Sequence, residues 1–218
     1  GSFTVTNARN GFSKNYAARC NLAAAPEAYT MKEQELALFQ PYATAQEFLT
    51  AQQMDWLITE NAPRVTEGKL SYGNTDANLR RSRVALLGHE QKYKWLYERL
   101  WAAVQACNPQ YFDVEVAGVG PNVQVARYDS SDSGFYDWHF DFGPAKPQRK
   151  LSISVQLSSS DDYDGGDLEL MFGNVPTKLD RTRGAFIIFP SFMLHRVTPV
   201  TRGTRWSLVA WIHGKRWR

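Results

Sequence analysis

The chain has 218 residues, of which 43% are hydrophobic and 22% are charged, and its formal net charge is +3. These values are ordinary for a globular domain and exclude a disordered tail or a fibrous protein. A small net charge without a long basic run ahead of the C-terminus is atypical of a nucleic-acid-binding protein. We therefore expect residues 1–218 to form a single domain that has no nucleic-acid partner.

Cysteine usage is sparse, with only Cys20 and Cys107 and no C-x-x-C pattern. Such usage provides no disulfide framework and is typical of a reducing compartment. No stretch resembles a signal peptide, and none is apolar over the length needed to cross a bilayer. The sequence predicts a cytoplasmic protein without a membrane partner and leaves the oligomeric state open.

Residues 1–120 are expected to form a mostly helical support. The segment 44–47 has the S/T-x-x-E form of a capping box, and apolar residues then recur at helical spacing up to a stop at 60–63. A second helix is expected from near His89 to Asn108, where Pro109 follows. The apolar stripes of both helices are expected to pack against the outside of a sheet.

Between these helices, residues 67–78 are polar and contain two glycines, a composition typical of a loop. The surrounding region 64–83 is interpreted either as a lid over a binding site or as a simple connector. Three arginines, Arg80, Arg81 and Arg83, end this region. They are interpreted either as a solvated rim or as a contact for an acidic substrate segment.

Short β-forming runs recur in residues 121–218, with turn signals and no helical pattern between them. Strands are expected at 122–128, 135–141, 150–158, 167–172, 185–189, 194–200 and 205–213. A turn is expected at Arg202-Gly203. The fold class is therefore predicted as mainly β with helical support (α+β), a double-stranded β-helix or cupin-like jelly roll with N-terminal helices packed on the sheet.

An H-x-D pair, His139 and Asp141, stands in the expected strand 135–141. Residues two apart on a strand share one face, so both side chains are expected to reach one ion. An isolated pair of this kind is more often a hydrogen-bonded core feature than a metal site. With His195 added, two imidazoles and one carboxylate form the ligand set that holds non-heme Fe(II) and leaves open positions.

Arg205 follows His195 after the expected turn. Two neighbouring antiparallel strands are expected to bring His195 and Arg205 close together. A guanidinium offers a planar fork that binds a carboxylate at two points, whereas a lysine offers only a point charge. The sequence thus predicts a carboxylate-binding residue beside the metal site.

These segments together resemble the Fe(II)- and 2-oxoglutarate-dependent dioxygenases of the prolyl 4-hydroxylase type. The matching segments are 125–128, 136–141, 149–157, 163–170 and 189–211. The resemblance implies that His139, Asp141 and His195 bind iron and that Arg205 binds the far carboxylate of 2-oxoglutarate. It implies a catalytic core over 121–218, Fe(II) and 2-oxoglutarate as cofactors with ascorbate as a candidate reductant, and release of succinate and CO2.

The resemblance also implies roles for five further residues. Tyr128 is expected to line the cofactor site, and Gln156 to stand where some relatives use a tyrosine on the far carboxylate. Trp211, Arg149 and Tyr136 are expected to contact the substrate, although an aromatic residue in a small barrel is more often packing. The implied substrate is a prolyl residue in a peptide or protein.

A second hypothesis is a hydroxylase of a free amino acid or other small metabolite, with Arg127 or Arg149 binding the substrate's own carboxylate. A nucleic-acid demethylase is disfavoured because no second arginine follows in 207–211. Among the remaining histidines, His89 is expected to be solvated. His213 is expected at the rim of the barrel and is the reserve metal ligand.

Overall fold

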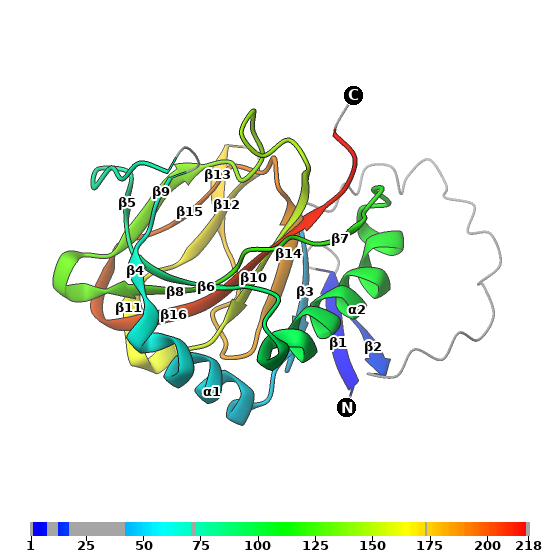
Figure 1. The fold of residues 1–218 in the computed structure, drawn as a ribbon, viewed down its shortest axis with the longest axis horizontal. Coiled ribbons are helices and arrows are strands. Elements are labelled where there is room, and N and C mark those ends of the chain that lie inside the picture. Colours follow the sequence, from blue (N-terminus) through cyan, green and yellow to red (C-terminus); the bar gives the residue numbers. More distant parts are fainter. Residues whose placement is uncertain (1, 8–12, 18–41, 71–72, 173, 217–218) are drawn as a thin grey trace.

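A computed structural model describes residues 2–7, 13–17, 42–70, 73–172 and 174–216 of the chain. Within these ranges, two antiparallel sheets face each other, and two α-helices cover the outer face of the larger one (Figure 1). The predicted fold class, a mainly β jelly roll with helices packed on the sheet, is confirmed. No helix in the described ranges is long and apolar enough to cross a membrane.

The larger sheet has the strand order β2-β1-β3-β14-β10-β16-β8-β6-β4, and β11 and β7 pair with β16 beside this path. Its strands are β1 (Ser2–Asn7), β2 (Ser13–Ala17), β3 (Ala43–Gln46), β4 (Thr66–Glu67), β6 (Arg83–Leu87), β7 (Gly118–Val119), β8 (Val123–Asp129), β10 (Arg149–Gln156), β11 (Tyr163–Gly165), β14 (Phe186–Pro190) and β16 (Val200–His213). The long strand β16 pairs with both β10 and β8 and therefore forms the middle of this sheet.

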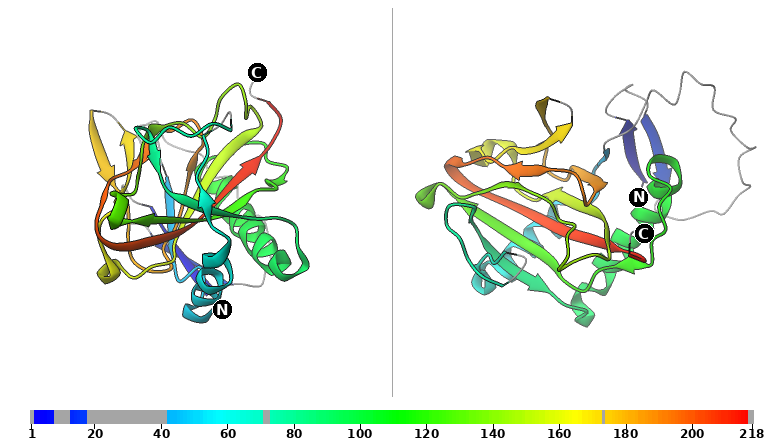
Figure 2. Two further views of the ribbon diagram at one scale, coloured as in Figure 1. Left: turned by 60° about the vertical axis from the view of Figure 1, so that its left-hand side comes forward. Right: turned by 90° about the horizontal axis from the view of Figure 1, so that it is seen from above.

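The smaller sheet has the order β13-β12-β15-β9-β5. Its strands are β5 (Arg80–Arg81), β9 (Phe135–His139), β12 (Leu168–Phe172), β13 (Val175–Lys178) and β15 (His195–Val197). In all views this sheet lies on the side of the larger sheet opposite the helices (Figures 1 and 2). The space between the two sheets is therefore closed on one side by helix-backed strands.

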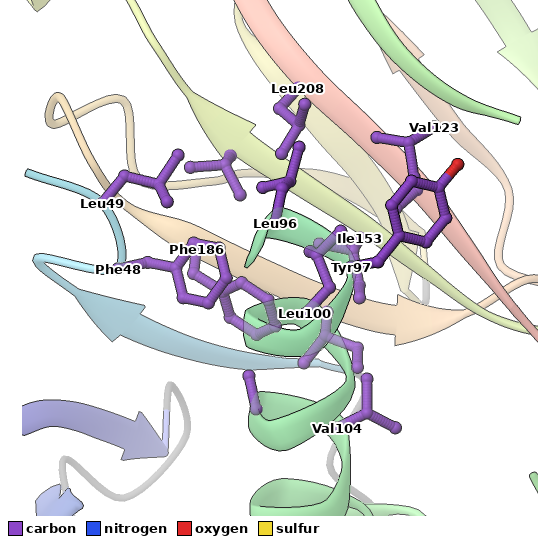
Figure 3. Packing of buried hydrophobic residues seen from close by; sticks show 14 of the residues in the cluster. Phe48, Leu49, Leu96, Tyr97, Leu100, Val104, Val123, Ile153, Phe186 and Leu208 are labelled. Carbon is purple, nitrogen blue, oxygen red and sulfur yellow. The ribbon is translucent and has the colours of Figure 1, made fainter. Parts of the chain in front are cut away.

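Helices α1 (Ala51–Asn61) and α2 (Lys94–Tyr111) pack against the outer face of the larger sheet. Strand alternation explains this core, because every second residue of β8, β10 and β16 points toward the helices. Figure 3 shows ten labelled members of this cluster, namely Phe48, Leu49, Leu96, Tyr97, Leu100, Val104, Val123, Ile153, Phe186 and Leu208. Burying their apolar surface holds the sheet against the helices and fixes which strand faces look inward.

The opposite faces of the same strands point into the space between the sheets. On β10 the apolar residues Leu151, Ile153 and Val155 alternate with the buried polar residues Ser152 and Gln156. A second apolar cluster lies between the sheets and includes Tyr128 of β8 and Phe189 of β14. The interior of the barrel is therefore partly polar, as a binding site requires.

The described part of residues 1–120 contains less helix than expected, which corrects the prediction of a mostly helical support for that part. Besides α1 and α2, the described part of this region contributes strands β1 to β7. Their partners lie far away in the sequence: Ala43 of β3, for example, pairs with Ile188 of β14. Local sequence patterns do not report such long-range pairing.

The capping box predicted at 44–47 is wrong, since Ala43–Gln46 is strand β3. The capping box of α1 lies further along, where the Thr50 side chain accepts from the backbone N–H of Gln53 and the Gln53 side chain accepts from the backbone N–H of Thr50. Pro109 does not end α2, which continues to Tyr111. Ala43 and Ala45 are fully buried against β14, and this pairing overrides the local helix signal.

The turn expected at Arg202-Gly203 is also wrong, because both residues lie inside the single strand β16. Gly203 has φ +68, and a Cβ at this position would lie 1.9 Å from the carbonyl oxygen of Asp162. Glycine is needed here because β11 and the turn before it lie very close to the backbone of β16, and not because the chain reverses direction. The candidate lid 64–83 includes β4 and β5 in its described part, and its role as a lid stays a prediction.

Candidate functional site

Three side chains that could hold a metal ion meet in the space between the sheets. His139 is the last residue of β9, and it stands directly opposite His195 of β15 in the antiparallel ladder. The side chains of opposed residues lie on the same face of a sheet. One ligand atom each from His139, Asp141 and His195 lies within 4.8 Å of the others, and Nε2 of His195 is 3.4 Å from Oδ2 of Asp141.

Both imidazoles are oriented through their Nδ1 atoms. Nδ1 of His139 is 2.7 Å from the carbonyl oxygen of Asp137, and Nδ1 of His195 is 2.8 Å from that of Met193. A carbonyl only accepts, so each Nδ1 is the donor in these hydrogen bonds, and Nε2 is the ring nitrogen that remains to bind a metal. This is the arrangement in which histidine binds a metal.

Asp141 lies beyond the end of β9, so the alternation of side chains along that strand does not determine where its carboxylate points. Its backbone N–H donates to the carbonyl oxygen of Ser191 at 3.0 Å, and the Ser152 hydroxyl donates to its Oδ2 at 2.7 Å. The Ser152 and Ser191 hydroxyls are also 3.0 Å apart. Neither serine was predicted from the sequence, although the alternation of polar and apolar residues in 151–157 was a signal for Ser152.

Electrostatics place His139 and Asp141 in the protonation states that a metal needs. Burial, reinforced by the neighbouring His195, lowers the pKa of His139 from 6.5 to about 3. Burial alone would raise the pKa of Asp141, but its interactions with the two histidines outweigh burial and hold this pKa below its usual range. His139 is therefore neutral and Asp141 ionised at neutral pH, which makes both of them electron-pair donors.

Arg205 lies on β16, in the sheet opposite His195, so the expectation of two neighbouring strands was wrong. Only 1% of Arg205 is exposed, and its Nη2 donates to Oε1 of Gln156 at 2.9 Å while its Nη1 donates to the Ser207 hydroxyl at 3.2 Å. Its guanidinium carbon is 5.4 Å from the centre of the Tyr128 ring. No carboxylate in the described ranges pairs with it, and its Nε has no hydrogen-bond partner there.

The triad and Arg205 line one small cavity of about 60 Å³. Two imidazoles and a carboxylate are donors suited to Fe(II). A buried guanidinium without a carboxylate partner is suited to an anionic ligand, because an unpaired charge in a protein interior is costly. The residues present therefore fit a divalent metal together with a carboxylate-bearing co-substrate.

The predicted substrate residues lie around the mouth of this cavity. The Tyr136 ring stacks on His139 with 3.4 Å between centroids, and burial raises the pKa of Tyr136 to about 12. The guanidinium carbon of Arg149 is 3.5 Å from the centre of the Trp211 ring, and its Nη1 is 3.6 Å from Oδ1 of Asp141. Arg149 therefore connects the triad to the outer part of the site.

Three residues considered from the sequence do not join the triad. His89 is exposed and lies against Tyr97. His213 lines a wider groove outside the cavity, in agreement with the expected rim position. Arg127 pairs with Asp129 and covers Trp206, so it does not line the cavity.

Comparisons with known proteins agree with this geometry. Residues 123–213 match the family model described as the 2OG-Fe(II) oxygenase superfamily. A PKHD-type hydroxylase from Hyphomonas neptunium is 40% identical over 90 residues, which are 38% of this chain and 39% of that protein. One from Acidovorax ebreus is 41% identical over 91 residues, with the same coverage of 38% and 39%. The chain thus aligns with about two fifths of the length of these curated relatives.

Solved structures show the same fold over more of the chain. A prolyl hydroxylase from Trichoplax adhaerens, in complex with a peptide fragment of hypoxia inducible factor, has a TM-score of 0.68 and 20% identity, covering 83% of this chain and 86% of that chain. A prolyl-4-hydroxylase from Pseudomonas putida has a TM-score of 0.64 and 19% identity, covering 84% and 96%. The match to the 2OG-Fe(II) oxygenase superfamily over 123–213 thus coincides with the strands that carry the cluster of two histidines and one aspartate, and the fold is the jelly roll of these prolyl hydroxylase structures.

Proposed function

We propose that this chain hydroxylates an unactivated C–H bond, using Fe(II) held by His139, Asp141 and His195 and 2-oxoglutarate held by Arg205. The observation that carries the proposal is the buried guanidinium of Arg205, which lines the same small cavity as the triad and has no carboxylate partner among the described residues. A carboxylate ligand would supply the missing charge. A structural role for Arg205 would not explain why its hydrogen-bond partners are neutral.

In the overall reaction, one molecule each of 2-oxoglutarate, O2 and substrate is consumed, and one molecule each of succinate, CO2 and the hydroxylated product is formed. The bound iron and 2-oxoglutarate supply the oxidising chemistry. The protein positions them: Gln156 and Ser207 fix the plane of the Arg205 guanidinium, and Ser152 fixes the carboxylate of Asp141. Tyr128 lines the cavity beside Arg205 and excludes water from the co-substrate site.

We further propose that the hydroxylated group is a prolyl residue in a peptide or protein. The cavity of the triad adjoins a wider open groove of about 460 Å³, and Trp211 and Arg80 line both. An open groove next to the reactive centre suits an extended chain better than a free metabolite, which needs an enclosed pocket. The names of the similar proteins, which include prolyl hydroxylases, support this substrate class.

The test incubates the iron-loaded protein with 2-oxoglutarate, ascorbate as reductant, and a panel of proline-containing peptides. We expect a mass gain of one oxygen atom on proline, with one succinate formed for each hydroxylation. Arg205→Lys should retain the buried charge but lose the two-point contact, so the KM for 2-oxoglutarate should rise by about tenfold or more. If the KM for 2-oxoglutarate is unchanged in Arg205→Lys, Arg205 does not bind the co-substrate.

The alternative is hydroxylation of a free amino acid or small metabolite, with Arg149 binding the substrate carboxylate. Arg149 lines the groove, whereas Arg127 lines neither the groove nor the cavity, so Arg149 is the arginine available for this role. Oxygen incorporation into free proline but into none of the peptides would favour this alternative.

A further inference from the structure

The wider groove outside the triad carries an unbalanced charge. We call it the outer groove and define it by Lys69, Arg80, Gln124, Lys146, Arg149 and Trp211, which are among its lining residues. Four of these six side chains are cationic, and Glu67 is the single acidic residue in the lining. Binding sites concentrate one sign of charge where their ligand carries the other.

Of the four cations of the outer groove, only Arg149 pairs with a carboxylate of the described residues, that of Asp141. Among the residues that the structure describes, Lys69, Arg80 and Lys146 form no ion pair. The guanidinium of Arg80 donates instead to two neutral acceptors, the Ser82 hydroxyl at 2.7 Å and the carbonyl oxygen of Lys69 at 3.0 Å. These hydrogen bonds hold Arg80 in place and leave its charge available to a ligand.

Lys146 lies half-buried in the outer groove beside Arg149. Burial, together with the nearby charge of Arg149, lowers the pKa of Lys146 to about 8. Its Nζ lies 5.8 Å from the centre of the Trp211 ring, at the boundary between the groove and the triad cavity. An anion bound there would relieve the repulsion between Lys146 and Arg149.

Trp211 provides a second, independent sign of a ligand. Its side chain is 7% exposed, and its Nε1 has no hydrogen-bond acceptor among the described residues. Buried indole N–H groups ordinarily have a partner. Because Trp211 lines both the groove and the cavity, its free donor is available to an oxygen atom of a molecule lying between them.

We infer that the outer groove binds an acidic peptide segment, so that the preferred substrate carries aspartate or glutamate close to the hydroxylated proline. This inference rests on the proposed function and adds the charge class of the substrate. The carboxylates would lie against Lys69, Arg80 and Lys146, and a backbone carbonyl or carboxylate oxygen would accept from Nε1 of Trp211. Of the two interpretations of the arginine cluster 80–83, the contact with an acidic substrate therefore applies to Arg80.

An acidic peptide fits the groove better than a nucleic acid does. The lining includes the apolar residues Leu70, Val84 and Leu86 and the acidic Glu67 beside its cations. The carboxylate of Glu67 would repel a continuous phosphate backbone, and the lining has only Trp211 and the imidazole of His213 as rings on which bases could stack. Alternating acidic and apolar side chains of a peptide match this mixture.

The test compares two fluorescein-labelled peptides of equal length, each with one central proline flanked by aspartates or, at the same positions, by asparagines. Binding to the Mn(II)- and 2-oxoglutarate-loaded protein is measured by fluorescence anisotropy without oxygen, so that no turnover occurs. We expect the aspartate peptide to bind about fivefold tighter or more at low salt, and the difference to shrink as salt is added.

Variants assign the effect to the groove. The double variant Lys69→Gln, Lys146→Gln should remove most of the preference for the aspartate peptide, because it deletes two cations without adding bulk. Lys94→Gln is the matched control, since Lys94 is an exposed lysine of α2 outside the lining. Equal melting temperatures of the variants and the parent protein verify that each variant is folded.

Equal affinities for the two peptides, or no binding of either, would overturn the inference. An unchanged preference for the aspartate peptide in the double variant would do so as well. The inference would also fail if oligothymidylate displaced the aspartate peptide at a lower concentration than the unlabelled peptide does. Mass spectrometry of the same peptides under oxygen, with Fe(II), separates this inference from the proposed function. Equal hydroxylation of both peptides would overturn the charge preference alone. Groove-dependent binding of the aspartate peptide without hydroxylation would overturn prolyl hydroxylation alone.

Discussion

The guanidinium of Arg205 donates to the amide oxygen of Gln156 at 2.9 Å, across the paired strands β16 and β10. The Gln156 amide accepts a hydrogen bond from one N–H group of the buried guanidinium. Because the amide is neutral, the positive charge of Arg205 is not compensated. A carboxylate at position 156 would have neutralised Arg205 within the protein. The choice of glutamine therefore keeps a full positive charge in the cavity for an anionic ligand.

Substitution of Gln156 tests this relationship. Gln156→Glu should weaken 2-oxoglutarate binding by about 100-fold, because the new carboxylate pairs with Arg205 and repels the ligand. Gln156→Leu removes only a hydrogen bond and should cost about tenfold. Calorimetric titration of the Mn(II)-loaded proteins without oxygen measures both constants. If Gln156→Glu binds 2-oxoglutarate as tightly as the parent protein, Arg205 does not hold it.

Asp141→Ala should abolish metal binding and hydroxylation, because it removes the only carboxylate of the three-residue cluster. At a metal concentration of about 100 times the Kd, the parent protein should gain about 2.7 kcal/mol of stability, and the variant should gain none. Thermal unfolding with and without Mn(II) makes the comparison. Asp164→Ala, which removes an exposed carboxylate paired with Arg202, is the control and should keep the metal response. A metal response that survives in Asp141→Ala would contradict the assignment.

Ser152→Ala tests the residue that positions Asp141 without itself joining the cluster. Loss of its hydroxyl, which donates to Oδ2 of Asp141 at 2.7 Å, should weaken metal affinity by about 10- to 100-fold. Full activity should return at saturating metal, because the ligand itself remains. Titration of activity against Fe(II) measures the shift, and Ser160→Ala in the turn before β11 serves as the control. An unchanged titration curve would exclude the positioning role.

Cys107 provides a test of pH dependence away from the site. Burial raises the pKa of its thiol from an ordinary value of 9.0 to about 12 in the folded protein. An acid whose pKa is higher when folded contributes stability in full below pH 9, and this contribution falls as the pH rises from 9 toward 12. Denaturant unfolding should therefore show a steeper loss of stability above pH 9 in the parent protein than in Cys107→Ala.

The same thiol should resist alkylation in the folded protein. In a Cys20→Ser background, iodoacetamide at pH 8 should modify Cys107 only after denaturant is added, since the thiolate is the reacting form. Mass spectrometry counts the added group. Rapid modification without denaturant, or identical pH profiles of the parent protein and Cys107→Ala, would show that the thiol is not buried as described.

Much of the site could be predicted from the sequence because ligand chemistry depends on side-chain type. The sequence predicts a metal site with an arginine beside it. The four side chains concerned line one cavity in the structure, namely His139, Asp141, His195 and Arg205. Gln156 was also predicted, and Ser152 on the same strand could have been found from the two-residue alternation of β10. These signals are local, and strand periodicity is fixed by backbone geometry.

The tertiary structure alone decided how these residues meet. His195 and Arg205 face each other from different sheets, whereas the sequence favoured neighbouring strands. Ser191, far along the chain, places Asp141 beyond the end of β9. Pairing of β3 with β14 overrode a local capping signal, and the close approach to Asp162 explains Gly203 inside β16. The physical reason is the same in each case: strand pairing and the packing of sheets join residues far apart in the sequence, and no local pattern records their partners.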